Sequence, residues 1–239
     1  MIAQICEESK CTGCLACMNL CPCGAITCQE REDGNVIPQI DPEKCIECHR
    51  CVQGCPENHV KEKHEPRQCY AAWQKDRKER KYSASGGIAF GFYKRWIQNA
   101  GIVYGAAFNE KGILTQQKAE TLEEARKFRG SKYVQSYNGF SYSEIGKELK
   151  KGKKVLFIGT PCQIAGLKAY LGKASDALVT IDLICHGTPP MSYLEEYIKE
   201  IAGAEKVDRV SFRGEKDYHM VFYSQDRVVY SQRFRKALY

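Results

Sequence analysis

Eight cysteines near the start of this 239-residue chain form two copies of one pattern, and their spacing is that of iron–sulfur ligands. Each copy reads C-x-x-C-x-x-C-x-x-x-C-P, and each member of the second copy lies 34 residues after its counterpart. Two intervening residues let three thiolates converge on one cluster from a single loop, while the fourth cysteine completes the other cluster. We therefore predict two [4Fe–4S] clusters. The first set is Cys11, Cys14, Cys17 and Cys55, and the second is Cys45, Cys48, Cys51 and Cys21.

Zinc and disulfides are the alternatives for so many cysteines. Structural zinc usually takes two Cys pairs separated by a longer loop, which differs from three thiols at i, i+3 and i+6 with a fourth supplied from elsewhere. A disulfide framework needs an oxidising compartment, and we expect a cytoplasmic protein because the N-terminal residues do not read as a signal peptide. The duplicated pattern therefore favours iron–sulfur clusters.

Composition adds limits on the class of protein. The length allows one large domain or two ordinary ones, and 43% hydrophobic residues suffice for a core. No apolar run approaches the roughly 18 residues that a membrane span needs. The net charge of +7 is uneven, because residues 1–60 hold 4 basic and 9 acidic residues, leaving 32 basic and 20 acidic residues for the remainder. A basic second part favours an anionic cofactor or an acidic protein partner, whereas no nucleic-acid recognition motif is present.

Several cysteines and histidines near the clusters are surplus to the ligand count. We expect Cys6, Cys23 and Cys28 to be buried packing thiols or incidental. Histidine replaces cysteine in some clusters, but the full Cys set makes this unnecessary here. His49, His59 and His64 are therefore expected at the surface.

The cysteine repeat predicts a small domain of two similar loop–helix–hairpin units, with a turn at Asp33-Gly34 and a short edge strand at 36–38. Residues 63–81 read as a basic linker, in which the apolar Tyr70–Trp73 stretch could begin a strand.

From residue 82 onward, helical and strand patterns alternate. The spacing of Ile88, Phe92 and Trp96 predicts a helix with one apolar face. A capping box that begins at Thr121 predicts a second, short helix, which ends near Gly130. Strand–helix–strand order with apolar strands favours an α/β domain with parallel pairing, followed by antiparallel strands. The predicted strands are 102–108, 155–158, 178–184, 207–212, 219–223 and 227–231, of which 155–158 and 178–184 are expected to be buried; the other predicted helices are 143–151, 164–171 and 192–202.

Four places in this second part could hold a cofactor. Cys162 and Cys185 each follow a predicted strand, where ligands bind in open α/β sheets, and they could ligate a further cluster, line a redox cofactor or be buried structural thiols. The stretch 83–87 offers hydroxyls, unobstructed backbone N–H groups and a helix N-terminus, and 129–132 offers a second place for phosphate. Ser and Gly also make ordinary helix caps, so the first stretch alone is a weak signal.

These residues together resemble the beta subunit of coenzyme F420 (deazaflavin) hydrogenase/dehydrogenase. The similar segments are SASGG at 83–87, VYGAAF at 103–108, FRGSKYVQS at 128–136, GTPCQIAGL at 159–167 and DLICHG at 182–187. The resemblance covers nearly the whole chain, and fusions to an N-terminal two-cluster ferredoxin are common in this family.

The resemblance implies a fold, cofactors and partners. The fold is an α+β ferredoxin-like module at 1–62, the linker at 63–81, and an FAD-binding α/β domain at 82–239 with a partly parallel sheet and a C-terminal antiparallel portion. It implies an oxidoreductase subunit of anaerobes that passes electrons between a two-electron carrier and [4Fe–4S] clusters through FAD, with a ferredoxin, another redox protein or a catalytic subunit as partner. Carried onto this chain, the flavin-site candidates are Ser83, Ser85, Gly86, Gly87, Arg129, Gly130, Ser131, Lys132 and Thr160, with Cys162 and Cys185 as candidates for the flavin pocket or a third [4Fe–4S] cluster.

Two questions remain open at this point, the extent of the chain and its function. Similar proteins usually continue beyond residue 239 with a further CxxC pair, so either this chain is truncated or a partner completes its site. The competing function is a ferredoxin-type electron carrier on a flavin-free docking scaffold. A third interpretation is that the clusters only stabilise the fold and transfer no electrons.

Overall fold

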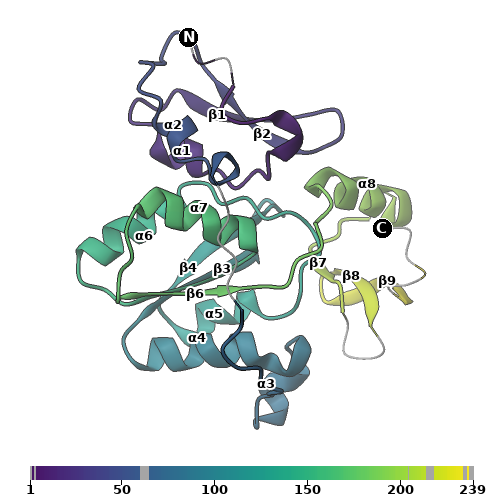
Figure 1. Cartoon of the computed structure of the whole chain (residues 1–239). Helices are drawn as coiled ribbons and strands as arrows, with labels where there is room; N and C mark the ends of the chain where they lie inside the picture. Colours follow the sequence, from purple (N-terminus) through teal and green to yellow (C-terminus); the bar gives the residue numbers. More distant parts are fainter. Residues whose placement is uncertain are drawn as a thin grey trace.

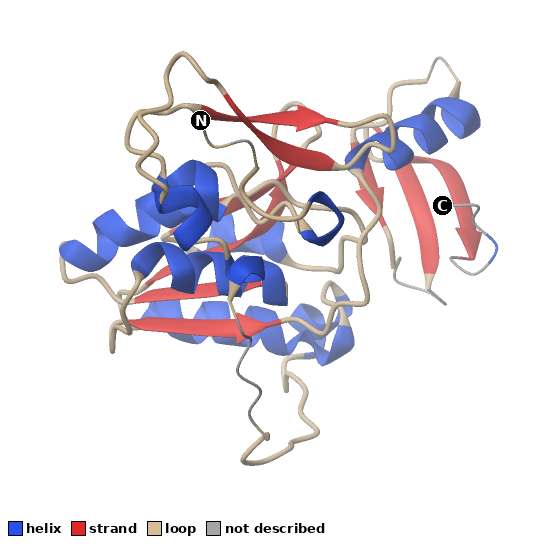
Figure 2. Ribbon diagram, turned by 45° about the horizontal axis from the view of Figure 1, so that its top comes forward, coloured by secondary structure: helices blue, strands red, loops and turns tan. Residues whose placement is uncertain are grey.

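A computed structural model describes residues 2, 4–59, 65–203, 205–213, 218–233 and 236. A cysteine-rich N-terminal module lies against one helical layer of an α/β domain, and a small antiparallel sheet lies at the side (Figure 1, Figure 2). The predicted combination of a ferredoxin-like module, a partly parallel sheet and a C-terminal antiparallel portion is therefore confirmed at this level. Within the described residues, no helix is both long and apolar enough to cross a bilayer.

The cysteine-rich module contains short elements around its two cysteine loops. Strands β1 and β2 form an antiparallel hairpin whose turn includes Gly34 at a φ of +76°, as predicted. A second hairpin was expected from the repeat, but residues 60–64, where it would begin, lie outside the described part of the chain. The elements are η1 (Glu8–Lys10), α1 (Ala16–Leu20), β1 (Ile26–Glu30), β2 (Val36–Ile40), α2 (Arg50–Gln53) and η2 (Pro56–Asn58).

The segment after the module contains a helix instead of the strand suggested at Tyr70–Trp73. The side chain of Trp73 is 62% exposed and no strand forms there, so that expectation is wrong. Helix α3 (Arg77–Lys81) begins after Asp76, whose carboxylate accepts hydrogen bonds from the backbone N–H groups of Lys78 and Glu79. The short apolar stretch has no partner strand to bury it, and sheet order is set by the strands that follow.

The α/β domain is built on a four-stranded sheet of order β4-β3-β5-β6. Strands β3, β5 and β6 are parallel, and β4 pairs antiparallel with β3 at the edge. The elements are η3 (Ser85–Gly87), α4 (Ile88–Gln98), β3 (Ile102–Phe108), β4 (Leu114–Ala119), α5 (Leu122–Ala125), η4 (Arg126–Phe128), α6 (Ser141–Lys150), β5 (Val155–Gly159), α7 (Pro161–Leu171) and β6 (Leu178–Asp182).

Helices cover both faces of this sheet. On one face, Tyr142 and Ile145 of α6 and Leu167 of α7 pack on alternate residues of β3 and β5. On the other face, Phe90 of α4 and Phe128 of η4 pack on the residues between them. Side chains of successive strand residues point to opposite faces, so both faces of β3 and β5 are apolar.

Two predictions of burial in this domain are wrong. Phe92 was placed on the apolar face of its helix, but it is 48% exposed, and Phe90 and Tyr93 are the buried pair instead. Strand β6 was expected to be buried and to run to Ile184. It is an edge strand that ends at Asp182, and Ile184 is 93% exposed in the loop beyond it. Apolar composition alone does not distinguish an edge strand from a central one.

The C-terminal part forms a separate small layer. Helix α8 (Met191–Ala202) packs with Leu194 and Tyr197 on a sheet of order β7-β8-β9. The strands are β7 (Arg209–Ser211), β8 (His219–Ser224) and β9 (Arg227–Arg233), all antiparallel as predicted.

The first cysteine loop is attached to the α/β domain by buried polar and apolar contacts. The carbonyl oxygen of Cys14 accepts hydrogen bonds from Asn138 Nδ2 at 3.0 Å and from Tyr142 Oη at 2.9 Å. Ala16 belongs to the same buried cluster as the core residues of α6 and α7. At Gly166 of α7, a Cβ would lie 2.9 Å from Tyr142 Oη and 3.2 Å from Cys14 Sγ. Only a glycine lets the helix approach the loop this closely.

The close contact at Gly166 predicts that Gly166→Leu will lower the free energy of unfolding of the protein. The larger side chain must displace the Cys14 loop, and overpacking of this kind costs about 1–3 kcal/mol. The midpoint of anaerobic urea unfolding should fall accordingly. The matched control is Lys168→Leu, an exposed position on the same helix, which should change the midpoint little. Equal midpoints for Gly166→Leu and wild type would contradict this account of the interface.

Candidate functional site

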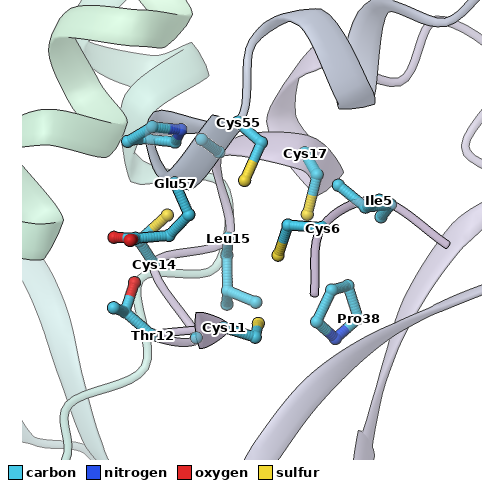
Figure 3. Close-up of a pocket in the computed structure, with 13 residues that line it drawn as sticks. Ile5, Cys6, Cys11, Thr12, Cys14, Leu15, Cys17, Pro38, Cys55 and Glu57 are labelled. Atoms are coloured by element: carbon cyan, nitrogen blue, oxygen red, sulfur yellow. The ribbon is translucent and has the colours of Figure 1, made fainter. Parts of the chain in front are cut away.

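The first predicted ligand set surrounds one cavity. Cys11, Cys14, Cys17 and Cys55 all line it, and their sulfurs face a common space of about 340 Å³ that is partly open to solvent (Figure 3). Three of these thiols come from the loop before and within α1, and the fourth comes from the residue before η2. The chain therefore brings together the cysteines that the spacing assigned to the first cluster.

The second predicted set surrounds a separate cavity of about 300 Å³. Its lining includes Cys21, Cys45, Cys48 and Cys51, together with apolar residues such as Ile26 and Ile40. No three Cys, His, Asp or Glu side chains in the described ranges meet closely enough to hold a single metal ion. Each cavity instead has its four predicted thiols, together with one further cysteine, around an open space, and four thiols are the donor set that a [4Fe–4S] cluster takes.

The two cysteine loops share an unusual backbone conformation. Gly13 and Leu15 in the first loop, and Glu47 and His49 in the second, all have φ between +53° and +62°. Each pair lies 34 residues from its counterpart, so the repeat extends from the sequence to the dihedral angles. Alternation of left-handed and right-handed residues forms the backbone nests that are common around anions and iron–sulfur sites. The cysteine spacing is thus supported by a matching backbone.

Of the predicted ligands at the first cavity, Cys17 and Cys55 are buried and Cys11 and Cys14 are half-buried, and all four must lose protons to bind iron. Burial, with a smaller contribution from the neighbouring Cys162, raises the pKa of the Cys14 thiol to about 11. Burial likewise raises the pKa of the Cys17 thiol. Because thiolates are the metal ligands, cluster assembly at neutral pH releases protons from these side chains.

The surplus cysteines occupy three different settings. Cys6 lines the first cavity with the four predicted ligands, and Cys23 lines the second. Cys28 is half-buried between Met18 and Tyr137 and lines neither cavity. Cys23 and Cys69 are exposed, so of the two expectations for Cys23 that of a buried packing thiol is wrong; Cys69 was not singled out from the sequence.

The histidines near the clusters lie as the sequence predicted where they are described. His49 and His59 are exposed, and His64 lies outside the described residues. Neither described imidazole lines either cavity.

The predicted loop at 83–87 is shaped in large part by the chain that precedes α3. Gly86 and Gly87 both have positive φ, and a Cβ on either would lie 3.1 Å from atoms of residues 72–74. The Ser83 hydroxyl donates to the carbonyl of Glu79. These glycines are therefore explained by backbone geometry and close packing, while Ser85 remains exposed at the N-terminal end of α4.

The predicted segment at 129–132 lies close to that loop, but its two cations already have partners. Arg129 forms an ion pair with Glu79 at 2.9 Å and packs over the rings of Tyr82 and Phe90. Lys132 Nζ donates to the carbonyls of Lys127 and Arg129, and burial lowers the pKa of its ammonium to about 7. Gly130 has open space around it. Arg129 and Lys132 thus hold the segment in place.

A residue that the sequence did not single out joins the two segments. Arg213, just after β7, donates to Ser85 Oγ at 3.4 Å and to Tyr133 Oη at 3.5 Å. It belongs to the C-terminal layer, so only the tertiary fold brings it to the α4 N-terminus. No local motif around Arg213 signals this role.

Thr160, Cys162 and Cys185 lie where adjacent parallel strands end. Gly159 pairs with Asp182, and Leu183 N–H donates to the Gly159 carbonyl, so the predicted neighbouring strands are present. Thr160 Oγ1 lies 3.1 Å from Cys162 Sγ. Cys162 lies near enough to Cys14 to contribute to the raised pKa of the Cys14 thiol, whereas Cys185 Sγ accepts a hydrogen bond from Gly187 N–H. Cys162 is therefore associated with the first cluster cavity, and Cys185 with the exposed loop after β6.

A buried amide network behind Thr160 was not predicted. Gln163 Oε1 accepts from Thr160 N–H and from Gln116 Nε2, and its own Nε2 donates to Ser136 Oγ at 2.7 Å. This network ties the start of α7 to β4 and to the chain before α6. It fixes the position of the Thr160–Cys162 turn.

Comparisons with known proteins agree with these features. Residues 152–236 match the family model for the C terminus of the coenzyme F420 hydrogenase/dehydrogenase beta subunit, and residues 10–59 match a 4Fe-4S dicluster domain. The F subunit of the F(420)H(2) dehydrogenase of Methanosarcina mazei is 25% identical over 200 residues, covering 77% of this chain and 55% of that protein. The B subunit of the Na(+)-translocating ferredoxin:NAD(+) oxidoreductase complex of Acetobacterium woodii is 44% identical over 48 residues, covering 20% of this chain and 13% of that protein.

A chain of the F420-reducing [NiFe] hydrogenase complex from Methanosarcina barkeri is similar with a TM-score of 0.47 and 20% identity, covering 67% of this chain and 61% of that one. This chain spans about half the length of the M. mazei protein and a smaller share of the A. woodii protein. The match of residues 10–59 to a 4Fe-4S dicluster domain and of residues 152–236 to the C terminus of the coenzyme F420 hydrogenase/dehydrogenase beta subunit confirms the resemblance predicted from the motifs.

Proposed function

We propose that this chain is the iron–sulfur flavoprotein subunit of an oxidoreductase, and that it transfers electrons between a two-electron carrier and one-electron protein partners. The observation that carries the proposal is the packing of the first cysteine loop against α7, the helix that begins at the carboxyl edge of the parallel strands. Ligands of open α/β sheets bind at this edge. The two-electron carrier that we propose is a deazaflavin such as coenzyme F420, which appears in the names of the similar proteins.

FAD bound at this edge would supply the conversion between hydride and single-electron chemistry. The donor set fits an anionic group at one place in particular. Ser85 and Arg213 meet at the N-terminal end of α4, an 11-residue helix whose positive end favours a pyrophosphate. Gly130, in the neighbouring predicted segment, has open space where a side chain would stand. We therefore assign phosphate binding to Ser85 and Arg213, with Arg129 and Lys132 as positioning residues.

The surroundings of the two cavities suggest an order for electron transfer. Cys14 is hydrogen-bonded through its backbone carbonyl to the α/β domain, so the first cavity lies beside the domain that carries the proposed flavin site. In the second cavity, Cys48 is exposed and Ile46 is 64% exposed. We propose that the first cluster exchanges electrons within the chain and that the second exchanges them with a partner protein.

The alternative function is an electron carrier on a flavin-free docking scaffold. This alternative is favoured by the contacts of Arg129 and Lys132. Both were predicted to bind phosphate, but Arg129 pairs with Glu79 and Lys132 donates to the Lys127 carbonyl within this chain. The flavin content of the purified protein separates the two functions.

Anaerobic purification with iron, sulfide and flavin quantified per chain tests the proposal. We expect about eight iron atoms, from two clusters of four, and about one FAD. Nearer twelve iron atoms would add a third cluster involving Cys162 and Cys185. Eight iron atoms without flavin, even after incubation with FAD, would support the carrier alternative.

The assignment of Arg213 predicts a loss of flavin affinity in Arg213→Ala. A hydrogen bond to a charged group contributes about 1.5–3 kcal/mol, so the Kd for FAD should rise roughly ten- to a hundredfold in a fluorescence titration. Arg209→Ala is the matched control, because Arg209 lies on β7, directly before the turn that carries Arg213, and instead contacts Asp226 and Tyr223. An unchanged Kd in Arg213→Ala would place the flavin phosphates elsewhere.

A further inference from the structure

The second cavity is lined by five cysteines, which is one more than a [4Fe–4S] cluster binds. Four of them are the predicted ligands, and the fifth is Cys23. This thiol lies two residues after the predicted ligand Cys21, with only Pro22 between them. It therefore competes with Cys21 for one corner of the cluster.

The geometry places the two thiols side by side. The Sγ atoms of Cys21 and Cys23 are 3.7 Å apart, and both residues line the cavity. Cys21 Sγ accepts a hydrogen bond from the N–H of Ala25 at 3.2 Å, whereas Cys23 lies on the exposed side. The two sulfurs therefore lie at the same edge of the second cavity.

The internal repeat places a side chain at the edge of a cavity at the position of Cys23 in both of its halves. Its counterpart 34 residues later is Glu57, which lines the first cavity. Both residues directly follow the Pro of a C-P pair, so the backbone carries the side chain at this position to the rim of a cluster. A carboxylate occupies that rim position at the first cavity, and a thiol occupies it at the second.

None of the other surplus thiols lines the second cavity. Cys28 faces Met18 and Tyr137, and Cys69 is exposed on the segment before α3; neither lines the second cavity. Cys6 lines the first cavity only. Cys23 is thus the one surplus thiol of the described residues that can reach the second cluster.

We propose that Cys23 is a reserve ligand of the second [4Fe–4S] cluster and replaces Cys21 when Cys21 is lost or displaced. In the exchange, the iron–sulfur bond to Cys21 breaks and one to Cys23 forms. The Cys23 thiol releases its proton, the freed Cys21 thiolate takes one up, and no electron is transferred. The proposal rests on the two clusters of the proposed function, and it gives the more exposed cluster a means to survive damage to one ligand.

Four variants test the proposal: Cys21→Ala, Cys23→Ala, the double variant Cys21→Ala/Cys23→Ala, and the control Cys21→Ala/Cys69→Ala. Alanine is used because a serine hydroxyl could itself bind iron. Iron and sulfide are quantified anaerobically after reconstitution, and the reduced proteins are examined by EPR. Both single variants and the control should keep about eight iron atoms per chain, with an altered spectrum for one cluster in Cys21→Ala. The double variant should keep only about four.

Alkylation of the native holoprotein gives an independent readout. Iodoacetamide followed by mass spectrometry should label Cys23 in the wild type, while in Cys21→Ala the labelling should fall to the level of the ligand cysteines. The proposal is overturned if Cys21→Ala holds seven iron atoms or fewer, or if Cys23 is labelled equally in both proteins. Cluster loss in Cys23→Ala alone would overturn it too, by making Cys23 the resident ligand. A wild type without about eight iron atoms would instead refute the proposed clusters themselves.

Discussion

The attachment of the first cysteine loop to helix α7 is the contact on which the rest of the functional arrangement depends. Two buried donors, from Asn138 and Tyr142, converge on the single carbonyl of Cys14, and Gly166 leaves room for the sulfur beside the helix. A buried carbonyl that loses its donors is costly, so these bonds fix where the loop can lie. Because the same loop supplies three of the four thiols of the first cavity, fixing it also fixes the first cluster relative to the sheet edge.

The repeat has the same chemistry in both halves but different surroundings. Gly13 and Glu47 adopt similar left-handed conformations, as do Leu15 and His49, so the local sequence determines the ligand loops. Burial then differs at equivalent positions: Cys14 is half-buried beside α7, whereas its counterpart Cys48 is exposed. Reduction potentials of such clusters depend on solvent exposure and on hydrogen bonds to the sulfurs. One duplicated motif can therefore give two clusters of unequal potential, set by what packs around them.

What the sequence could predict follows from the range of the interactions involved. The cysteine sets, the cap at Thr121 and the antiparallel C-terminal strands depend on neighbouring residues or on short periodicity, and the structure brings them out as expected. The burial of β6 and of Phe92 depends on which element packs beside them, and there the prediction failed. The contribution of Arg213 depends on a contact with a residue 128 positions away, which no local pattern encodes.

The stretch at 83–87 shows why a phosphate-like motif needs the surrounding fold to be interpreted. Its glycines are required by positive φ and by the close approach of residues 72–74, which accounts for their presence without any ligand. What remains for an anion is the Ser85 hydroxyl, the positive end of α4 and the guanidinium of Arg213. These three groups come from two layers of the protein. A flavin held there would therefore bind only when the C-terminal sheet is in place against the α/β domain, which makes cofactor binding a consequence of the whole fold and not of the motif.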